Sequence, residues 1–492
     1  MSFLNELQTV FSPEVMLWAG LGVLLGTLVG VLPGIGPTSA MAMLLAVTTQ
    51  MTPLSGLVML AGIYYGSQYG GSTTSILMNM PGEVSSVVTA FDGYPLARQG
   101  KAGHALTVAA ISSFVAGTIG LVLLTLFAEP LSNLAFYVKV PDYFLLLLLA
   151  MTIIVSLAGR SLTKGILSAA VGLLFATVGL DPVTGTPRLT FGSDTLLNGF
   201  SFASASIGLF ALGEVFFNAE SSVRGTLVSA VGKLYPSLRE ILGVVPTMLR
   251  STAIGFVGGL LPGVSPSTTS FIAYDVERRI AKDPSRFGKG ALEGVAGPEG
   301  ANNATTSSGF IPLMIFGIPP SPALAVLLGA FLIYGLAPGP LLFSQQPDIA
   351  WGLIGSMYAG NVMLLALNLP LVRMWVQVLK IPYRILAPVI ILLSVVGALS
   401  LRNNYFDVWV TLLFGLIGYL MRKFDFPLAP MILAIVLGPR VEALLRRSLQ
   451  ISAGSWTVFV SDPVGIALCV LIVLSLVGGL WQRRRLRHDQ FD

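Results

Sequence analysis

Long apolar runs separated by short polar segments dominate the pattern of this chain. Several runs carry no charged residue over the length that crosses the hydrocarbon core of a bilayer as a helix. The pattern therefore predicts an all-α polytopic membrane protein. The clearest predicted spans are Ala105–Phe127, Tyr143–Gly159, Gly165–Leu180, Ile385–Leu401 and Pro463–Trp481.

Two of the apolar runs end in a similar Pro- and Gly-rich segment. Residues 30–39 read GVLPGIGPTS and residues 259–268 read GLLPGVSPST. Proline removes a backbone donor and glycine weakens a helix, so a helix is expected to break at each segment. Broken helices at matching places in two halves are typical of transporters built from repeats. We therefore predict two structural repeats, favouring an inverted pair, with discontinuous helices and re-entrant hairpins.

The repeated segments divide the chain into four parts. Repeat 1 covers about residues 14–200, and repeat 2 covers about residues 243–450. A connecting span with a basic loop occupies residues 201–242, and a final span with a basic tail occupies residues 451–492. We expect about ten to twelve full crossings, together with about four short or re-entrant pieces.

Basic residues are concentrated in three places, residues 224–250, residues 275–289 and the tail at residues 482–488. Lys and Arg mark the cytoplasmic loops of membrane proteins. All three segments are therefore expected in the cytoplasm, and the C-terminus with them.

The Pro-Gly segments are candidates for ion binding. A helix broken in hydrocarbon leaves backbone carbonyls without partners, so such a break survives where it lines a cavity or is buried. Those carbonyls and the neighbouring hydroxyls would suit Na⁺, whereas a kinked, packed helix without a ligand is the alternative. The predicted Na⁺ ligands are Gly34, Gly36, Thr38, Gly263, Ser265 and Thr268.

A second pair of segments, residues 69–83 and residues 298–320, is rich in Gly, Ser, Thr and Asn, and each contains Thr-Thr-Ser before a proline. Helix N-termini at such breaks carry free N–H groups that suit a carboxylate. Packing of small residues between helices is the alternative. The predicted substrate-binding residues are Ser72, Thr73, Thr74, Ser75, Asn302, Asn303, Thr305 and Thr306.

Three glutamates, Glu83, Glu214 and Glu299, lie in or beside apolar sequence. Ionisable groups in such surroundings usually mark ion or proton pathways, so these residues are candidates for coupling or gating. For Glu214 the end of a span at the membrane interface explains the position equally well.

Two polar segments are expected outside the membrane. The sequence of residues 92–98 predicts a surface turn, with an ion pair between Asp92 and Arg98. Residues 181–192 have the turn chemistry of a small β-hairpin, which would serve as a docking or lid surface or as a plain connector.

The sequence has no sign of enzymatic chemistry. The one cysteine, Cys469, and the two distant histidines, His104 and His488, support neither a disulfide nor a His/Cys metal site. No phosphate-binding loop ending in Lys-Ser/Thr is present, and the scattered basic residues give no reason to expect a nucleic-acid partner. We expect no cofactor other than a coupling ion, Na⁺ or H⁺.

A set of short motifs runs along the chain. The motifs are GxLPG at 30–34 and 259–263, YGGS at 69–72, MPGE at 80–83, DGYPLA at 92–97, GLDPVTG at 179–185, GLFALGE at 208–214 and PEGANNA at 298–304. Together they resemble the large membrane subunit of the tripartite tricarboxylate transporter family, over about residues 14–440. The resemblance departs at Ile318-Pro319-Pro320, where the family usually has Ile-Pro-Gly, so the missing glycine is expected to alter the backbone here.

The resemblance implies a multi-pass protein of the bacterial inner (cytoplasmic) membrane that works as a secondary transporter. Its expected partners are a small four-span membrane subunit and a periplasmic solute-binding protein that delivers a carboxylate. The predicted function is import of a small, citrate-like di- or tricarboxylate, coupled to Na⁺ or H⁺, with elevator-like alternating access. An anion-selective channel, which also uses broken helices, is the competing class.

Overall fold

The computed structural model describes residues 10–32, 35–157, 161–181, 183–220, 232–233, 235–379, 381 and 383–488. Within these residues, nine helices are long and apolar enough to cross a membrane, and four shorter apolar helices accompany them. The predicted all-α polytopic class is confirmed. The nine long helices are fewer than the number of crossings expected, because some apolar runs form shorter helices, such as α8 (Leu162–Ala176).

The long helices include one that changes its winding, since α9 and α10 flank a π-helical stretch, η4. The nine are α2 (Pro13–Val31), α6 (Ala102–Ala135), α7 (Val140–Leu157), α9–η4–α10 (Phe202–Ser206, Ile207–Leu212 and Gly213–Glu220), α11 (Leu238–Leu260), α17 (Pro347–Asn368), α19 (Tyr383–Arg402), α20 (Tyr405–Lys423) and α21 (Leu428–Ile451).

The remaining described elements are shorter, more polar or only partly apolar. They are α3 (Pro37–Thr48), α4 (Pro53–Met78), η2 (Val84–Ser86), α5 (Val87–Arg98), β1 (Gly179–Leu180), β2 (Pro187–Arg188), η3 (Asp194–Asn198), α12 (Pro266–Ile280), η5 (Pro284–Arg286), α13 (Glu293–Ser308), α14 (Phe310–Phe316), α15 (Pro322–Ile333), α16 (Leu342–Gln345), α18 (Val372–Val378), η6 (Trp456–Val460) and α22 (Pro463–His488).

The helix breaks predicted at the two Pro-Gly segments are present. Helix α2 ends at Val31, and α3 begins at Pro37 after an extended Gly36. Helix α11 ends at Leu260, and α12 begins at Pro266 after an extended Ser265. In each case proline occupies the first helical position, where its missing N–H costs nothing.

The helix that precedes each Pro-Gly segment packs closely on a polar helix through glycine. A Cβ placed on Gly30 would lie 2.3 Å from the Ser67 carbonyl oxygen of α4, and one on Gly259 would lie 2.6 Å from the Thr305 carbonyl oxygen of α13. Backbones approach this closely only where small residues face each other. By these contacts, Ser67 of α4 corresponds to Thr305 of α13. Alignment of the two Thr-Thr-Ser sequences instead makes Thr73 the counterpart of Thr305. The equivalence of the two halves as repeats stays a prediction.

Each of the two polar segments turns just before its proline, Pro81 or Pro319. Residues 69–78 continue α4 through its glycines, and the chain turns at Asn79, which adopts a left-handed conformation with φ of 54°. In the second segment the turn falls at Gly317, with φ of 65°. The predicted Ser, Thr and Asn residues therefore lie inside helices and not at helix N-termini, which corrects the reason given for their choice. We call residues 79–86 tip one and residues 317–321 tip two.

Tip two also explains how the chain accommodates Pro320. The left-handed turn is made by Gly317, so position 320 needs no positive φ and tolerates proline. The turn at tip two therefore does not depend on a glycine at position 320.

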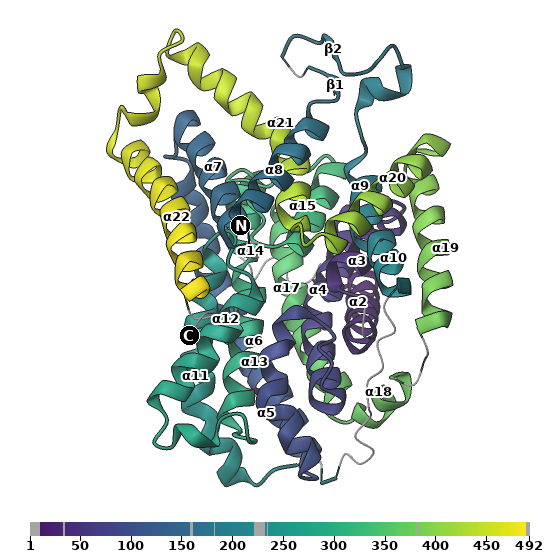
Figure 1. The fold of residues 1–492 in the computed structure, drawn as a ribbon, viewed down its shortest axis with the longest axis vertical. Helices are drawn as coiled ribbons and strands as arrows, with labels where there is room; N and C mark the ends of the chain where they lie inside the picture. The colour runs from purple at the N-terminus through teal and green to yellow at the C-terminus, as the bar shows by residue number, and fades with distance from the viewer. Residues whose placement is uncertain are drawn as a thin grey trace.

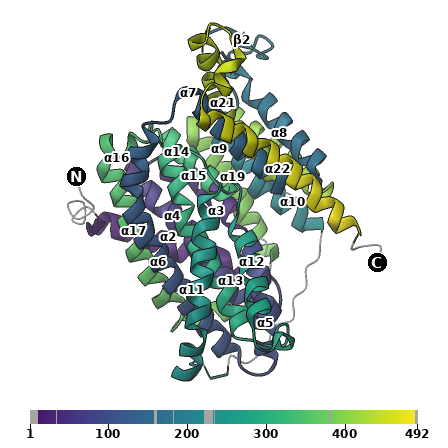
Figure 2. The same cartoon turned by 90° about the vertical axis from the view of Figure 1, so that its left-hand side faces the viewer.

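The molecule has two distinct ends. The hairpin formed by β1 and β2 lies at one end, and α5 and α11 lie towards the other (Figure 1). In the view turned by 90°, α22 slants along the outside from the hairpin end towards the C-terminus (Figure 2). We refer to the two ends as the hairpin end and the α5–α11 end.

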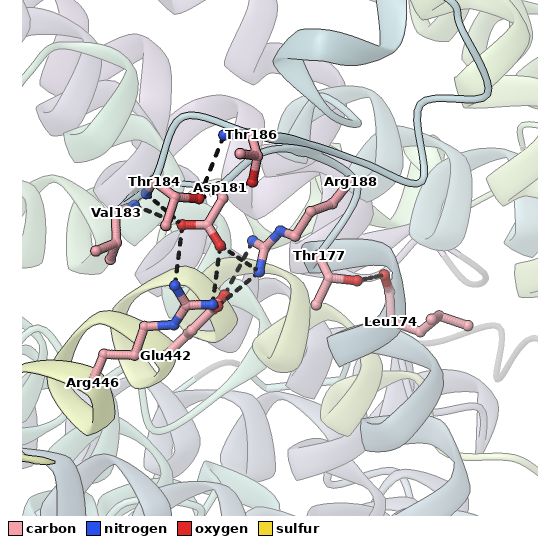
Figure 3. A network of polar contacts seen from close by, with 9 residues as sticks. All are labelled: Leu174, Thr177, Asp181, Val183, Thr184, Thr186, Arg188, Glu442 and Arg446. Carbon is pink, nitrogen blue, oxygen red and sulfur yellow. Dashed lines mark hydrogen bonds and ion pairs between the residues drawn. The ribbon is translucent and has the colours of Figure 1, made fainter. Parts of the chain in front are cut away.

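The predicted β-hairpin is present, and a charged network fixes it to α21. Strands β1 and β2 pair antiparallel, with Gly179 opposite Arg188. Asp181 accepts hydrogen bonds from the backbone N–H groups of Val183 and Thr184. It also forms ion pairs with Arg188 and with Arg446, the latter at 3.0 Å. Glu442 forms ion pairs with the same two arginines (Figure 3). The backbone N–H groups, helped by Arg446, lower the pKa of Asp181 to about 2.

The expected surface ion pair between Asp92 and Arg98 is not formed. Asp92 is fully buried, and its carboxylate accepts from the backbone N–H groups of Gly290 and Ala291 at 2.8 Å each. The Tyr274 hydroxyl donates to its other oxygen at 2.9 Å. The residue is a structural tie between α5 and the loop before α13, because a buried carboxylate needs hydrogen-bond donors.

Candidate functional site

A cavity of about 510 Å³ lies where the two Pro-Gly segments and the two tips meet. We call it the central cavity. These four segments are far apart in the sequence. The wall is completed by ordinary spans, including Ile154 and Leu157 of α7 and Leu433 of α21. The lining from the four segments is Gly36, Pro37, Thr38, Ser39, Pro81, Gly82, Glu83, Val84, Gly263, Ser265, Pro266, Ser267, Thr268, Pro320 and Ser321.

Three helices begin at the central cavity. Helices α3, α12 and α15 have 12, 15 and 12 residues, and the first residues of each belong to the lining. Ser265 and Ser321 cap α12 and α15, whereas the cap of α3 is Gly36, which offers no side-chain oxygen. Helix N-termini carry partial positive charge and free N–H groups, so this end of the cavity attracts anions.

Among the described lining residues, Arg422 of α20 is the one cation. Its Nη2 lies 3.6 Å from Glu214 Oε2, and its Nε is buried without a hydrogen-bond partner. Glu214 also accepts a hydrogen bond from Ser39 Oγ at 2.6 Å. An arginine with an unused donor beside a cavity is suited to a carboxylate, since guanidinium binds carboxylates through two parallel hydrogen bonds.

Glu83, a predicted coupling residue, lines the central cavity as the cap of η2. Its Oε1 accepts hydrogen bonds from the backbone N–H and the hydroxyl of Ser85. The Ser85 hydroxyl also lies 2.9 Å from Gln68 Oε1, which ties tip one to α4. Glu83 and Glu214 therefore face one cavity, as a coupling role requires.

Most of the predicted Na⁺ ligands also line the central cavity, namely Gly36, Thr38, Gly263, Ser265 and Thr268. Gly34 lies outside the described residues. The hydroxyls of Ser265, Ser267 and Thr268 form a cluster, with Ser265 Oγ and Ser267 Oγ 2.7 Å apart. Oxygen donors are what hard cations prefer, so the arrangement fits the predicted ion while Na⁺ binding itself stays a prediction.

The predicted substrate-binding residues are not part of the cavity lining. Thr74 Oγ1 donates to the Val31 carbonyl at 2.7 Å, and Thr305 Oγ1 donates to the Gly255 carbonyl at 2.9 Å, so each holds the end or body of a Pro-Gly helix. Their contact with substrate stays a prediction, and their hydrogen bonds support packing. The whole set, all buried, is Ser72, Thr73, Thr74, Ser75, Asn302, Asn303, Thr305 and Thr306.

Glu299, the third predicted coupling residue, lies in a separate buried cluster. Its carboxylate accepts hydrogen bonds from the hydroxyls of Ser72, Thr89 and Ser113. The amide of Asn303 donates to Ser113 Oγ at 2.7 Å. These contacts join α13 to α4, α5 and α6. A carboxylate surrounded by hydroxyls can hold a proton or a small cation, so its predicted role fits this geometry.

Sequence reasoning missed Arg422, Tyr64 and Gln68, which all line the central cavity. Arg422 follows an uncharged apolar stretch and is followed by Lys423, a pattern typical of a span that ends at the membrane interface. Tyr64 and Gln68 share one face of α4, four residues apart. The presence of two polar residues at helical spacing beside glycine was the available signal.

Helices broken around a cavity that charged and hydroxyl groups line in part, within a bundle of apolar spans, are typical of a membrane transport protein. The comparisons identify its family. The model of the tripartite tricarboxylate transporter TctA family matches residues 16–433, and the chain belongs to this family. Membership implies partner subunits, including a binding protein.

Two relatives from Agrobacterium vitis are similar to this chain. The first, described as "Uncharacterized 52.8 kDa protein in TAR-I ttuC' 3'region", is 45% identical over 98% of this chain and 96% of its own length. The second, "Uncharacterized protein in TAR-II ttuC' 3'region", is 44% identical over 48% of this chain and 98% of its own length. No solved structure matches.

Proposed function

We propose that this chain carries a small di- or tricarboxylate, of the size of citrate, across the bacterial inner membrane through the central cavity. The observation that carries the proposal is the meeting of three helix N-termini and Arg422 around one cavity. A volume of about 510 Å³ lies within the range of small-molecule sites. A periplasmic binding protein would deliver the substrate, and a small four-span subunit would complete the complex.

In this proposal the carboxylates of the substrate are shared between two kinds of donor. One carboxylate binds Arg422, which has a buried Nε without a partner. The others bind the first-turn N–H groups of α3, where Gly36 leaves the N-terminus without a side-chain cap. The substrate would then replace Glu214 as the partner of Arg422.

The charges of the lining give a reason for ion coupling. The described lining contains two carboxylates, Glu83 and Glu214, and one guanidinium, Arg422. A multivalent anion entering this cavity is repelled unless cations or protons neutralise the glutamates. We propose that Na⁺ bound by the Pro-Gly segments, or H⁺ bound by the glutamates, supplies that neutralisation, so that substrate and ion move together.

The proposed movement is elevator-like. The cavity wall contains residues of the tips and Pro-Gly segments together with residues of ordinary spans. In this proposal the first set slides past the second and carries the substrate with it. Ser321 of tip two and Leu433 of α21 both line the cavity. A disulfide between cysteines at these positions, in a Cys469→Ser background, is expected to stop uptake until it is reduced. Full uptake while cross-linked would contradict the movement.

The experiment that tests the function is uptake of labelled citrate, and of a panel of other di- and tricarboxylates, by vesicles containing the complex. R422Q is expected to lower uptake by about 10- to 100-fold, since a charge-assisted hydrogen bond contributes about 1.5–3 kcal/mol. R447Q removes an exposed arginine elsewhere and is expected to leave uptake unchanged. Equal uptake in R422Q and wild type would contradict the site, and passive flux without accumulation would favour a channel.

A further inference from the structure

A small cavity of about 10 Å³ lies beside the buried carboxylate of Glu299. We call it the Glu299 cavity. A space of this size holds one particle of about the size of a water molecule. Its walls come from α4, α6, α13 and the end of α17, and it shares no described residue with the lining of the central cavity. The lining is Tyr69, Ser72, Thr73, Leu106, Ala109, Ala110, Ser113, Glu299 and Asn368.

Glu299 is buried without a cation. The residue is 1% exposed and forms no ion pair with any residue that the structure describes. Its electrostatic neighbour is Glu83, a carboxylate whose charge has the same sign. Burial of an unpaired charge is costly, so a carboxylate in such a place binds a cation or a proton.

The hydrogen bonds around Glu299 are those of an ionised carboxylate. Three hydroxyls donate to it, from Ser72 at 2.6 Å, from Thr89, and from Ser113 at 3.0 Å. The amide of Asn303 donates to Ser113 Oγ, so the proton of Ser113 is directed at the carboxylate. A carboxylate accepts about four hydrogen bonds. One acceptor position of Glu299 Oε2 therefore remains for a group in the cavity.

Asn368 lines the same cavity and has an oxygen without a partner. Its Nδ2 donates to the Leu364 carbonyl oxygen at 3.0 Å, whereas its Oδ1 is buried and accepts no hydrogen bond from the described residues. A buried acceptor that stays unsatisfied is costly, so it indicates a group that the oxygen binds. Glu299 and Asn368 thus present two acceptor oxygens to one space of atomic size.

We propose that the Glu299 cavity binds one Na⁺ without hydration water. The carboxylate of Glu299 and Oδ1 of Asn368 bind the ion, and the hydroxyl oxygens of Ser72, Thr73 and Ser113 complete its surroundings. Hard cations prefer such oxygen ligands. One carboxylate balances one positive charge, which favours Na⁺ over Ca²⁺, whose sites have six to eight oxygens and usually several carboxylates. This Na⁺ is separate from the one proposed at the Pro-Gly segments, and it does not depend on the substrate.

The bound ion connects the two halves of the chain. Ser72 and Thr73 of α4 and Ser113 of α6 precede the second Pro-Gly segment, whereas Glu299 of α13 and Asn368 of α17 follow it. Without the ion, the charge of Glu299 stays buried and unpaired. Na⁺ is therefore expected to stabilise the folded protein, because a ligand that binds only the folded state raises its stability.

Thermal unfolding of the full-length protein in detergent, without substrate, measures this binding. Sodium chloride is expected to raise the Tm of the wild type by several degrees over choline chloride of equal ionic strength. E299Q is expected to lose this shift, since its neutral amide needs no cation. N368L, which replaces the amide by an apolar side chain of similar size, is expected to need about tenfold more Na⁺ for half the shift. The matched control E277Q changes a buried glutamate that already has a cation, Arg250 at 2.7 Å, and is expected to keep the shift.

A further variant distinguishes this site from Na⁺ at the Pro-Gly segments. T268V removes a predicted ligand that lines the central cavity and is expected to keep most of the shift. If T268V abolishes the shift and N368L keeps it, the ion binds at the Pro-Gly segment and the Glu299 proposal is wrong. A wild-type protein that Na⁺ does not stabilise would also overturn the proposal, and stabilisation by acid alone would show a proton at the site instead.

Thr73 provides a second test of the ligand set if N368L does not fold. T73V removes one hydroxyl oxygen from the lining at nearly constant volume, so the packing of α4 is kept. It is expected to raise the Na⁺ concentration for half the shift several-fold. The wild-type Na⁺ dependence in both T73V and E299Q would contradict binding in the Glu299 cavity.

Discussion

The hydroxyl of Ser39 donates a hydrogen bond of 2.6 Å to the carboxylate of Glu214. Ser39 is the last residue of the first Pro-Gly segment and lies in the first turn of α3, and Glu214 lies in the first turn of α10. The same Glu214 oxygen faces Arg422 of α20. One carboxylate thus connects a broken helix, a continuous span and the cation that the proposed substrate needs.

Removal of the Glu214 charge is expected to uncouple substrate from ion. In E214Q the guanidinium of Arg422 loses its resting partner, so carboxylate binding no longer depends on a cation to neutralise Glu214. We expect substrate exchange to persist, while uptake driven by the ion gradient falls about tenfold or more. Parallel assays of exchange and gradient-driven uptake measure the two effects. E220Q, a change on an exposed residue of the same helix, is the control, and unchanged ion dependence in E214Q would argue against coupling through this residue.

Replacement of Gly30 by a larger residue is expected to destabilise the protein. A Cβ at Gly30 would lie 2.3 Å from the Ser67 carbonyl oxygen, and backbone cannot yield as a flexible side chain can. G30A is expected to lower stability by about 1–3 kcal/mol. Thermal unfolding in detergent measures the loss, with G478A as the matched control because no atom lies within 4 Å of a Cβ there. A G30A protein as stable as G478A would show that this packing is wrong.

Substitution of Thr74 distinguishes a role in helix packing from a role in substrate binding. Its hydroxyl satisfies the Val31 carbonyl at the end of α2, so T74A is expected to lower stability by about 1–3 kcal/mol through an unsatisfied buried group. The KM for substrate is expected to stay unchanged, since Thr74 does not line the central cavity. Uptake kinetics and thermal unfolding of T74A and T74S, in which the hydroxyl is kept, measure both. A raised KM with unchanged stability would restore the substrate role expected from the sequence.

The hairpin network is expected to resist acid over an unusually wide range. The pKa of Asp181 is about 2 in the folded protein and about 3.9 in the unfolded chain. Ionised Asp181 therefore contributes fully to stability above about pH 3.9, and this contribution is lost as the pH falls towards 2. Hydrogen exchange of residues 183–192, corrected for intrinsic rates, is expected to stay slow down to about pH 4. D181N is expected to exchange faster with no such pH step. Loss of protection in the wild type between pH 7 and pH 5 would disagree with the network in Figure 3.

Local chemistry explains which parts of the structure the sequence predicts. Pro37 and Pro266 each occupy the first helical position, which proline favours, and a Pro-Gly pair lies just before each of them, so the breaks at these segments follow from local residue types. The hairpin at residues 179–188 follows in the same way from its turn residues.

Tertiary context decides the remainder. Helix α4 runs through Gly70 and Gly71, where the backbone of α2 packs against Gly70 and tip one packs against Gly71. A propensity argument does not include these neighbours. Asp92 resembles a surface residue in sequence, but three donors from distant residues bury it. Arg422 likewise belongs to the site only because α20 packs against α10, which places Arg422 beside Glu214.

The most direct test of the account is protection of the central cavity by substrate. Ser267 lines the cavity and is half-buried, so a single cysteine there, in a Cys469→Ser background, reports access by a membrane-permeant maleimide. Ser455→Cys, exposed and remote from the cavity, is the control. Citrate or a related carboxylate, together with the coupling cation, is expected to slow labelling at position 267 several-fold and to leave position 455 unaffected. Labelling at position 267 that no di- or tricarboxylate slows, in a preparation that still transports one, would contradict the central claim.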